Sequence, residues 1–437
     1  MAERADAFPD MLQQRVGEMA SACVACGKCF EACPSVRHAG IGDSSATAVT
    51  EGIREILRGN EGGPLAEQWA GLCTSSGRCT TVCDYGINPR FMVAMARAAL
   101  RERGTTSEER RAAGRQGFSG MSRGVRTLAR LQLTPAQLER VSPESFGDDV
   151  IDPDVMFYTG CNVLKTPHIV LLCLDVFDAL GVRYAVAGGP QACCGVLQFR
   201  AGDMDASGRV GNATIAKLAR GAGQVVSWCP SCQVQLNEVA LPNRDDPAPF
   251  TLTPFIRFLE DNLEPLRKLM THRVEKRVGL HEHPGIPGVA EGVRRILRSI
   301  EGLEFVDLPQ PDLGLMCATM SKDLKHATHG DLLANAERAG VDTLAGIYHA
   351  CHRDLCAHEA GWPFEVVNFM DLVGASMGIE HEDVYKRLKM LADADAVMKA
   401  SAGMIDAHQL DNAEVREVVV RDLLGEQSLP VRRPETP

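Results

Sequence analysis

The feature that most constrains this chain is a run of closely spaced cysteines near its N-terminus. Residues 23–34 read Cys-x2-Cys-x2-Cys-x3-Cys-Pro, and the four thiols belong to Cys23, Cys26, Cys29 and Cys33. This spacing is typical of bacterial iron–sulfur proteins, in which the first three thiolates hold one cubane cluster and the fourth reaches a second cluster. Gly27 lets the backbone wrap closely around such a cluster. A structural zinc site is the alternative that this run leaves open.

A second run repeats the same frame with one thiol missing. In residues 73–84, Ser76 stands where the second cysteine would be, and Asp84 replaces the proline. If the last cysteine of each run crosses over to the other cluster, the two runs together predict two ligand sets. These sets are Cys23, Cys26, Cys29 and Cys83 for one cluster, and Cys33, Cys73, Cys79 and Ser76 for the other.

Ser76 decides what the second cluster can be. A serine hydroxyl has a far higher pKa than a cysteine thiol, so it is a poor ligand at neutral pH. Three outcomes are open: a [3Fe–4S] cluster that lacks the corner iron, an atypical [4Fe–4S] cluster whose corner iron is held by serine oxygen or solvent, or an empty site. We favour a cluster of reduced nuclearity.

A separate group of five cysteines lies further along the chain. Its members are Cys161, Cys193, Cys194, Cys229 and Cys232. The adjacent thiolates of Cys193 and Cys194 cannot chelate one iron comfortably, because successive side chains diverge, but they can bridge two irons of an opened cluster. Each part of the motif follows a predicted strand, where the loops of α/β sheets converge to form sites. Structural zinc is again the alternative.

Composition excludes several other classes of protein. The chain has 437 residues, of which 45% are hydrophobic and 24% charged, which predicts a soluble globular protein of two or three domains. A net charge of −11 argues against a nucleic-acid partner. No apolar run is long enough to span a bilayer, and the first fifteen residues lack the apolar core of a secretory signal. Sixteen cysteines in such a chain indicate clusters or metals rather than disulfides, and a cytoplasmic location is expected.

The pattern of the chain changes near residue 151. Before this point, helices are expected around the first cysteine group, followed by a basic segment that is either a solvated linker with a helix or a docking face for an acidic partner. After it, short strands alternate with helices, which is α/β character. The expected helices are 11–20, 47–58, 91–102, 167–180 and 210–219, and the expected strands are 155–158, 183–187 and 224–228.

The α/β region is followed by a degenerate copy of itself. A shift of about 122 residues places Cys161 on His283, Cys229 on Cys351 and Cys232 on Asp354, and a shift of 123 places Cys194 on Cys317. A period this long indicates duplicated domains rather than a solenoid. The strands 304–307 and 343–348 and the helix 289–300 are expected in the second copy.

The donors of the second copy differ from those of the first. Met316 replaces the first of the paired cysteines, so a second cluster of the same kind is not expected. The copy either holds a mononuclear metal such as zinc or is a metal-free relic. Alternatively, His281 and His283 supply protons beside the cluster of the first copy. The candidate metal ligands are His283, Cys317, Cys351, Asp354 and Cys356, with His352 as a further donor.

The five-cysteine frame resembles the cysteine-rich CCG domain of the catalytic subunit of heterodisulfide reductase. The N-terminal frame, with 39 residues between Cys33 and Cys73, resembles the α-helical ferredoxin domains of succinate dehydrogenase and heterodisulfide reductase. In the former family a missing second cysteine goes with a three-iron cluster. The resemblance implies that the five cysteines hold a non-cubane [4Fe–4S] site at which a disulfide is reduced.

The fold class that these observations imply is α plus α/β: an N-terminal α-helical ferredoxin domain followed by two repeated α/β cysteine-rich domains. The expected boundaries are 1–105 for the ferredoxin domain, 106–150 for the basic linker or helical segment, 151–272 and 273–378 for the two cysteine-rich domains, and 379–437 for a helical extension and tail.

The predicted function is that of a redox subunit that passes electrons through N-terminal clusters to the five-cysteine site, where a disulfide is reduced or formed. The alternative is an electron-relay subunit of a flavin-dependent 2-hydroxyacid or glycerol-3-phosphate dehydrogenase that feeds quinone, because the iron–sulfur subunits of those enzymes share this layout. A non-redox zinc scaffold is a third interpretation. No complete Gly-x-Gly-x-x-Gly follows a strand, so flavin-containing or other iron–sulfur subunits are expected partners. A membrane cytochrome or quinone-linked partner would place the chain at the inner face of the membrane.

Overall fold

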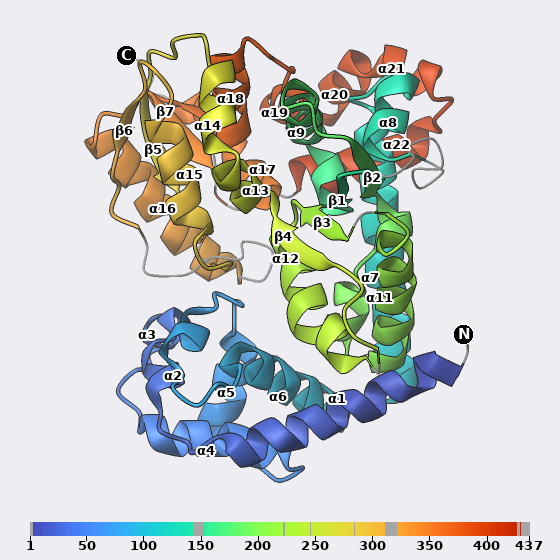
Figure 1. The fold of residues 1–437 in the computed structure, drawn as a ribbon, viewed down its shortest axis with the longest axis vertical. Coiled ribbons are helices and arrows are strands. Elements are labelled where there is room, and N and C mark those ends of the chain that lie inside the picture. The colour runs from blue at the N-terminus through green and yellow to red at the C-terminus, as the bar shows by residue number, and fades with distance from the viewer. Residues whose placement is uncertain are drawn as a thin grey trace.

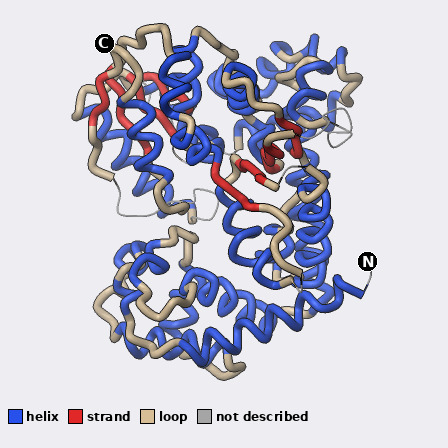
Figure 2. The backbone as a smooth tube through the Cα atoms, in the orientation of Figure 1, coloured by secondary structure: helices blue, strands red, loops and turns tan. Residues whose placement is uncertain are grey.

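The protein is described by a computed structural model. The described residues are 3–143, 153–310, 321–425 and 429, without the single residues 222, 245 and 284. A helical unit at the N-terminal end lies below a larger part that contains the strands (Figure 1). Figure 2 shows that all of the strands belong to this larger part, where helices surround them.

The N-terminal unit is built of short helices around the cysteine loops. Phe30 and Trp69 meet edge to face at its centre, with ring centroids 5.2 Å apart, inside a core that the apolar faces of α1, α4 and α6 complete. The three helices expected from the sequence are present. The elements are α1 (Glu3–Ala22), α2 (Lys28–Glu31), α3 (Pro34–His38), α4 (Ala46–Leu57), α5 (Pro64–Leu72), η1 (Arg78–Val82) and α6 (Pro89–Gly104).

The basic segment that follows contains the expected helix, and this helix packs against the rest of the fold. It forms the long helix α7 (Ser107–Arg130), which a capping box at Thr106 and Glu109 begins, and the short helix α8 (Pro135–Val141). Val125 and Leu128 of α7 are buried in two different apolar cores. These buried apolar positions were not predicted, because arginines dominate the sequence of the segment. Arg111 and Arg123 form ion pairs with Asp205 and Glu417, so part of the basic face is used within the chain.

The first α/β unit has a four-stranded parallel sheet in the order β2-β1-β3-β4. Strand β1 is buried along its whole length, as expected for a strand covered on both faces. The strands are β1 (Val155–Gly160), β2 (Tyr184–Gly188), β3 (Gln224–Ser227) and β4 (Thr251–Pro254). The helical elements are η2 (Asn162–Lys165), α9 (His168–Ala179), η3 (Pro190–Ala192), α10 (Val196–Ala201), α11 (Met204–Leu218), α12 (Pro230–Val234), η4 (Gln235–Ala240), η5 (Leu241–Asn243), α13 (Phe255–Asp261) and α14 (Leu263–Leu269).

The second α/β unit has a parallel sheet of the same design, in the order β6-β5-β7-β8. Both sheets place their first strand between the second and the third. The duplication of the cysteine-rich domain itself stays a prediction. The strands are β5 (Arg277–His281), β6 (Glu304–Val306), β7 (Thr343–Gly346) and β8 (Glu365–Asn368). The helical elements are α15 (Val289–Arg298), α16 (Lys322–Arg338), α17 (His349–Leu355), η7 (Cys356–Gly361) and α18 (Phe369–Met377).

One apolar core joins the two sheets. Trp228, which follows β3, stacks on Phe369 of the second unit with ring centroids 6.0 Å apart. Its indole Nε1 donates a hydrogen bond to Nδ1 of His349 over 3.3 Å. The two units are therefore held against each other by buried aromatic contact as well as by the chain that connects them.

The C-terminal extension is helical, as expected, and packs back on the fold. Its residues Val415, Val419 and Leu423 lie in one core with Leu128 of α7. The elements are α19 (Val384–Met390), α20 (Ala394–Ala400), α21 (Ala402–Ala407), α22 (Asn412–Val418) and η8 (Val419–Leu424). Among the described residues, no helix has both the length and the apolar character needed to cross a membrane.

Candidate iron–sulfur and thiol sites

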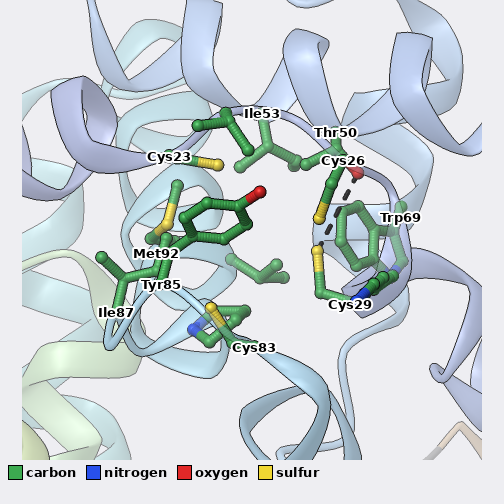
Figure 3. A pocket seen from close by; sticks show the side chains of 14 residues that line it. Cys23, Cys26, Cys29, Thr50, Ile53, Trp69, Cys83, Tyr85, Ile87 and Met92 are labelled. Carbon is green, nitrogen blue, oxygen red and sulfur yellow. Dashed lines mark hydrogen bonds between the residues drawn. The ribbon is translucent and has the colours of Figure 1, made fainter.

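Four cysteines from the two N-terminal runs line one small cavity. They are Cys23, Cys26, Cys29 and Cys83, which is the first set that crossed ligation predicts. In Figure 3 they stand around a space walled by apolar side chains, among them Ile53, Trp69 and Met92. Burial raises the pKa of the Cys29 thiol to about 11, although the Thr50 hydroxyl, 3.9 Å from its sulfur, opposes this shift. The structure therefore brings this predicted set together.

The second predicted set lines a neighbouring cavity. Its members are Cys33, Cys73, Ser76 and Cys79. Ser76 is 8% exposed, and its hydroxyl accepts a long hydrogen bond, 3.5 Å, from the backbone N–H of Arg78. Trp69 lines both cavities and separates the two sets. Ser76 thus stands at the corner that a fourth thiol would occupy.

The two runs share one backbone conformation. Gly27 and Gly77 both have positive φ, 87° and 77°, and each begins a short helical turn. Two positions earlier, Ala25 and Ser75 also have positive φ, 52° and 59°, which is uncommon for residues with a side chain. The loop around Ser76 therefore keeps the shape of the loop around Cys26, although the thiol is absent.

The five cysteines further along the chain converge at the carboxyl ends of β1, β2 and β3. Hydrogen-bonding contacts between sulfurs link Cys161 to Cys193, Cys193 to Cys194, Cys194 to Cys232, and Cys232 to Cys229. Cys161 is partly exposed and the other four are buried. The structure thus gathers the whole predicted set at one end of the first sheet.

Two neighbouring groups fix this sulfur cluster in place. Gly160 has φ +74°, and a Cβ there would lie 2.9 Å from Cβ of Cys229 and 3.1 Å from Sγ of Cys232. Only glycine fits this position. The Tyr158 hydroxyl donates a hydrogen bond to the carbonyl of Ala192 over 2.8 Å and lies 3.6 Å from Sγ of Cys232.

The charges of the five thiols are strongly coupled. Hydrogen bonds from Cys161 and Cys194 lower the pKa of Cys193 to about 3, while the contact with Cys193 raises the pKa of both donors well above the ordinary value. Five thiolates this close repel one another unless cations separate them. The arrangement therefore fits a cationic iron cluster better than five free thiols.

The distances between the cysteine sulfurs bear on the choice between an iron–sulfur cluster and a single zinc ion. Within the described part of the chain, only one group of three His, Cys, Asp or Glu side chains has donor atoms all within 4.8 Å of one another, and it contains no cysteine. The sulfurs of a tetrahedral zinc site, each about 2.3 Å from the metal, would lie that close. Among the described cysteines, no three sulfurs show the spacing of a closed tetrahedral zinc site.

Arg90 connects the N-terminal unit to both α/β units. It is 4% exposed, and its guanidinium forms an ion pair with Glu238 of η4. Its Nη1 donates hydrogen bonds to the carbonyls of Ser75, at 3.1 Å, and Gly285, at 2.6 Å. The loop of the second set is thereby fastened to the first α/β unit and to the β5–α15 segment of the second.

A cavity lies between the loop of the second set and the five-cysteine site. It is lined by Ser75 on one side, by Ser231, which stands between Cys229 and Cys232, on the other, and by Arg90 and Arg200. Burial lowers the pKa of Arg200, and negative charge on the cysteines of the five-thiol site opposes that shift. A positive side chain thus faces the thiols.

The candidate donors of the second α/β unit are less well gathered. Asp354 forms an ion pair with Lys325 over 2.9 Å, and Cys356 is buried in the core shared with the C-terminal extension. His283, Cys351, Asp354 and Cys356 supply no trio of donor atoms within 4.8 Å among the described residues. Cys317 and Met316 lie outside the described residues, so a metal site that includes Cys317 stays a prediction.

His283 is not suited to the alternative role of a proton source. Its ring packs edge to face on Tyr348, with centroids 4.9 Å apart. Burial lowers the pKa of His283 to about 3, and the nearby His281 adds to the effect. The imidazole is therefore neutral near pH 7 and does not titrate there.

Two family models match the chain in the order that the structure shows. The 4Fe-4S dicluster domain matches residues 19–87, and the cysteine-rich domain that carries the CCG motif matches residues 155–237. The first match covers both cysteine runs, and the second covers all five cysteines of the thiol site. The chain is accordingly an iron–sulfur protein with a ferredoxin-type domain followed by a cysteine-rich region.

Whole-chain relatives narrow this class. The chain is 23% identical to a subunit of the dihydromethanophenazine:CoB–CoM heterodisulfide reductase of Methanosarcina barkeri, with 82% of this chain and 94% of the relative covered. It is 24% identical to the same subunit from Methanosarcina acetivorans over the same shares. It is also 25% identical to a subunit of the fumarate reductase (CoM/CoB) of Methanothermobacter marburgensis, over 65% of this chain and 56% of that one. The chain is a heterodisulfide reductase-like iron–sulfur protein.

Sequence reasoning did not find the residues that join the units. Arg90 follows the second cysteine run within an ordinary amphipathic helix, and its partners Glu238 and Gly285 are more than a hundred residues away. Arg200 follows Cys194 by six residues, and that closeness to the paired cysteines is the one signal that could have drawn attention to it.

Proposed function

We propose that the chain carries electrons between a partner subunit and a disulfide or thiol substrate at the five-cysteine site. The observation that carries this proposal is the convergence of five sulfurs at the end of the first sheet, beside the loop that holds Ser76. A disulfide takes up two electrons and two protons to give two thiols, so a single reducing site needs a supply of electrons delivered one at a time. The N-terminal unit would supply them.

The cysteine sets fit three cofactors. We assign Cys23, Cys26, Cys29 and Cys83 to a [4Fe–4S] cubane. Cys33, Cys73 and Cys79 are assigned to a cluster of reduced nuclearity, [3Fe–4S], because Ser76 offers a hydroxyl at the fourth corner. The five thiols from Cys161 to Cys232 are assigned to a non-cubane [4Fe–4S] site, since adjacent cysteines suit an opened cluster. When bound, these groups supply one-electron carriage and reactivity toward sulfur.

The protein's own residues orient and stabilise the reaction site. Gly160 and Tyr158 hold the sulfur set in position, and Arg90 fixes the Ser76 loop against the first α/β unit. Arg200 places positive charge beside the site, which favours thiolate over thiol. Apolar walls exclude water from the buried cysteines.

The partner is proposed to dock at the open edge of the first cavity. Cys26 is exposed there, and its neighbours Val24 and Tyr85 are 53% and 49% exposed, unusually high for apolar or aromatic side chains. A flavin-containing or other iron–sulfur subunit is the kind of partner that this edge would serve. The relatives are named as subunits of reductases, which supports a partner of this type.

The direction of electron flow separates two versions of the proposal. One group of relatives belongs to an enzyme named for reducing a heterodisulfide, whereas the Methanothermobacter marburgensis relative belongs to one named for fumarate reduction with CoM and CoB. We favour disulfide reduction, because the heterodisulfide reductase relative is matched over 94% of its length and the fumarate reductase relative over 56%.

Anaerobically purified protein, a reduced viologen dye and the CoB–CoM heterodisulfide provide the test. The expected result is oxidation of two equivalents of dye per disulfide, with two thiols released. The Cys193→Ser variant should lose this activity while the N-terminal cubane keeps its paramagnetic resonance signal. Dye oxidation by quinone, with none by any disulfide, would contradict the proposal and favour the relay function for a flavin dehydrogenase.

A further inference from the structure

Two histidines and an aspartate that belong to none of the cysteine sets meet in the interior. His168 begins α9 of the first unit, His352 lies in α17 of the second, and Asp383 precedes α19 of the extension. Their donor atoms all lie within 4.8 Å of one another. They form the one trio of this kind among the described residues, and its members come from three separate parts of the fold (Figure 1).

One ring nitrogen of each histidine faces a carboxylate oxygen of Asp383. Nε2 of His352 lies 2.6 Å from one carboxylate oxygen of Asp383, and Nδ1 of His168 lies 3.5 Å from the other. The two imidazole rings are 5.5 Å apart at an angle of 66°. His168 is 2% exposed and His352 is fully buried.

The histidines have unused hydrogen-bonding capacity. Among the described residues, neither ring nitrogen of His168 has a hydrogen-bond partner, and Nδ1 of His352 has none either. Buried polar atoms rarely lack a hydrogen-bond partner, because an unpaired one has lost its contacts with water and gained nothing in return. Both nitrogens of His168 are buried and unpaired in this way. This is an observation, independent of the distances, that indicates a ligand bound near the two rings.

A second carboxylate stands behind His168. Oδ1 of Asp371 lies 3.8 Å from Nε2 of His168, on the side of the ring away from Asp383. Its other oxygen accepts a hydrogen bond from the backbone N–H of Asn368 over 2.8 Å. Histidines that bind metals commonly donate their second N–H to a carboxylate, which fixes the ring and raises its basicity.

The local charge also calls for a cation. Lys386 interacts electrostatically with Asp371 and Asp383, but its Nζ forms an ion pair with Glu359 at 2.8 Å and donates to the carbonyl of Val366. With that lysine engaged, Asp371 and Asp383 place two carboxylates beside the imidazole of His168.

We propose that His168, His352 and Asp383 bind one zinc ion, with Asp371 orienting His168. Two imidazoles and one carboxylate are a ligand set that zinc accepts, with a fourth position left for water or the second carboxylate oxygen. No cysteine is needed. The ion would join the first unit, the second unit and the C-terminal extension, and its role would be to fix their arrangement rather than to carry electrons.

The test is metal analysis of the full-length protein. Wild-type protein is expected to hold one zinc per chain at this site, and His168→Gln and His352→Gln are each expected to lose it while iron per chain stays unchanged. His326→Gln, at an exposed histidine of α16 outside the trio, is the matched control and should keep the zinc. Wild-type protein that binds no zinc, or variants that keep it, would overturn the proposal.

A measurement on the wild-type protein avoids variants that fail to fold. Zinc-edge X-ray absorption should show only nitrogen and oxygen neighbours, at about 2.0–2.2 Å. Sulfur neighbours at about 2.3 Å would place the zinc at the cysteines and contradict the assignment. Because iron content and disulfide reduction are read separately, failure here would leave the proposed function untouched.

Discussion

The two α/β units share a sheet but not a chemistry. Both have four parallel strands in the same order, yet β1 ends at Gly160 and leads into Cys161, whereas β5 leads into Glu282 and His283. The sheets depend on buried apolar strands, while the donors stand in loops at the strand ends. Donors can therefore change without loss of the fold, and a shared architecture says little about whether both copies bind a cofactor.

The N-terminal runs repeat this lesson on a smaller scale. The loops at Cys26 and Ser76 have matching backbones, including positive φ at Ala25 and Ser75. One loop presents a thiol and the other a hydroxyl. In both pairs of regions the backbone is kept and one member has lost sulfur, so the difference between members can be tested by exchanging single side chains.

The largest effect is expected where the two α/β units differ most. Cys229→Ser should abolish disulfide reduction, because Cys229 belongs to the linked set of five sulfurs. Cys351→Ser, at the matching position of the second unit, should leave most of the activity. Dye-linked turnover and iron per chain measure both outcomes. Equal loss in the two variants would show that the second unit takes part in the chemistry.

Substitution of Arg90 tests whether its contacts with the two α/β units stabilise the position of the N-terminal unit. Arg90→Gln removes a buried ion pair with Glu238 and the hydrogen bond to Gly285, and should lower the free energy of unfolding by about 3–5 kcal/mol. The control is Arg111→Gln, whose exposed pair with Asp205 should be worth less than about 1 kcal/mol. Denaturant unfolding under anaerobic conditions gives both values. Similar small losses would mean that the Arg90 junction contributes little.

Substitution of Gly160 tests how closely the backbone of the first α/β unit packs against the cysteine side chains. Gly160→Ala should cost about 2–4 kcal/mol, since it combines a strained backbone with a clash against Cys229. At Gly181, φ is +69° but the space is open, so Gly181→Ala should cost about 1–2 kcal/mol. Thermal unfolding with iron analysis separates the two. A Gly160→Ala protein with full iron and unchanged stability would refute the fit described for this site.

The smallest effect is expected at Ser76. Ser76→Cys restores the missing thiol on a backbone already shaped for it, and should add about one iron per chain and replace a three-iron resonance signal with a four-iron one. Ser107→Cys adds a thiol at the exposed start of α7 and should change neither. An unchanged signal in Ser76→Cys would mean that this corner was already occupied by iron.

Local spacing explains what could be predicted from the sequence. The cysteine sets that line common cavities could be predicted because cysteines recur within a few residues in each run, and the crossed pairing follows from the same frame. Helices such as α4 and strands such as β1 were found from apolar periodicity. The packed nature of α7 was missed, because its arginines concealed Val125 and Leu128.

Contacts across the fold explain what could not be predicted. His168 and Asp383 are 215 residues apart, and each has an ordinary local role, one beginning an apolar helix and the other capping α19. Nothing in the neighbouring sequence distinguishes them from other residues in such positions. Only the packing of three units brings them together, and the same holds for Arg90 and Glu238.

The exposure of Cys26 at the edge of the first cavity also bears on the sensitivity of the protein to oxidation by air. Cys26 meets solvent there, whereas four of the five cysteines at the thiol site are buried. Oxidants react first with accessible thiolates. A preparation handled aerobically should therefore bleach in two stages, first at the N-terminal cavity beside Cys26 and later at the buried five-cysteine site.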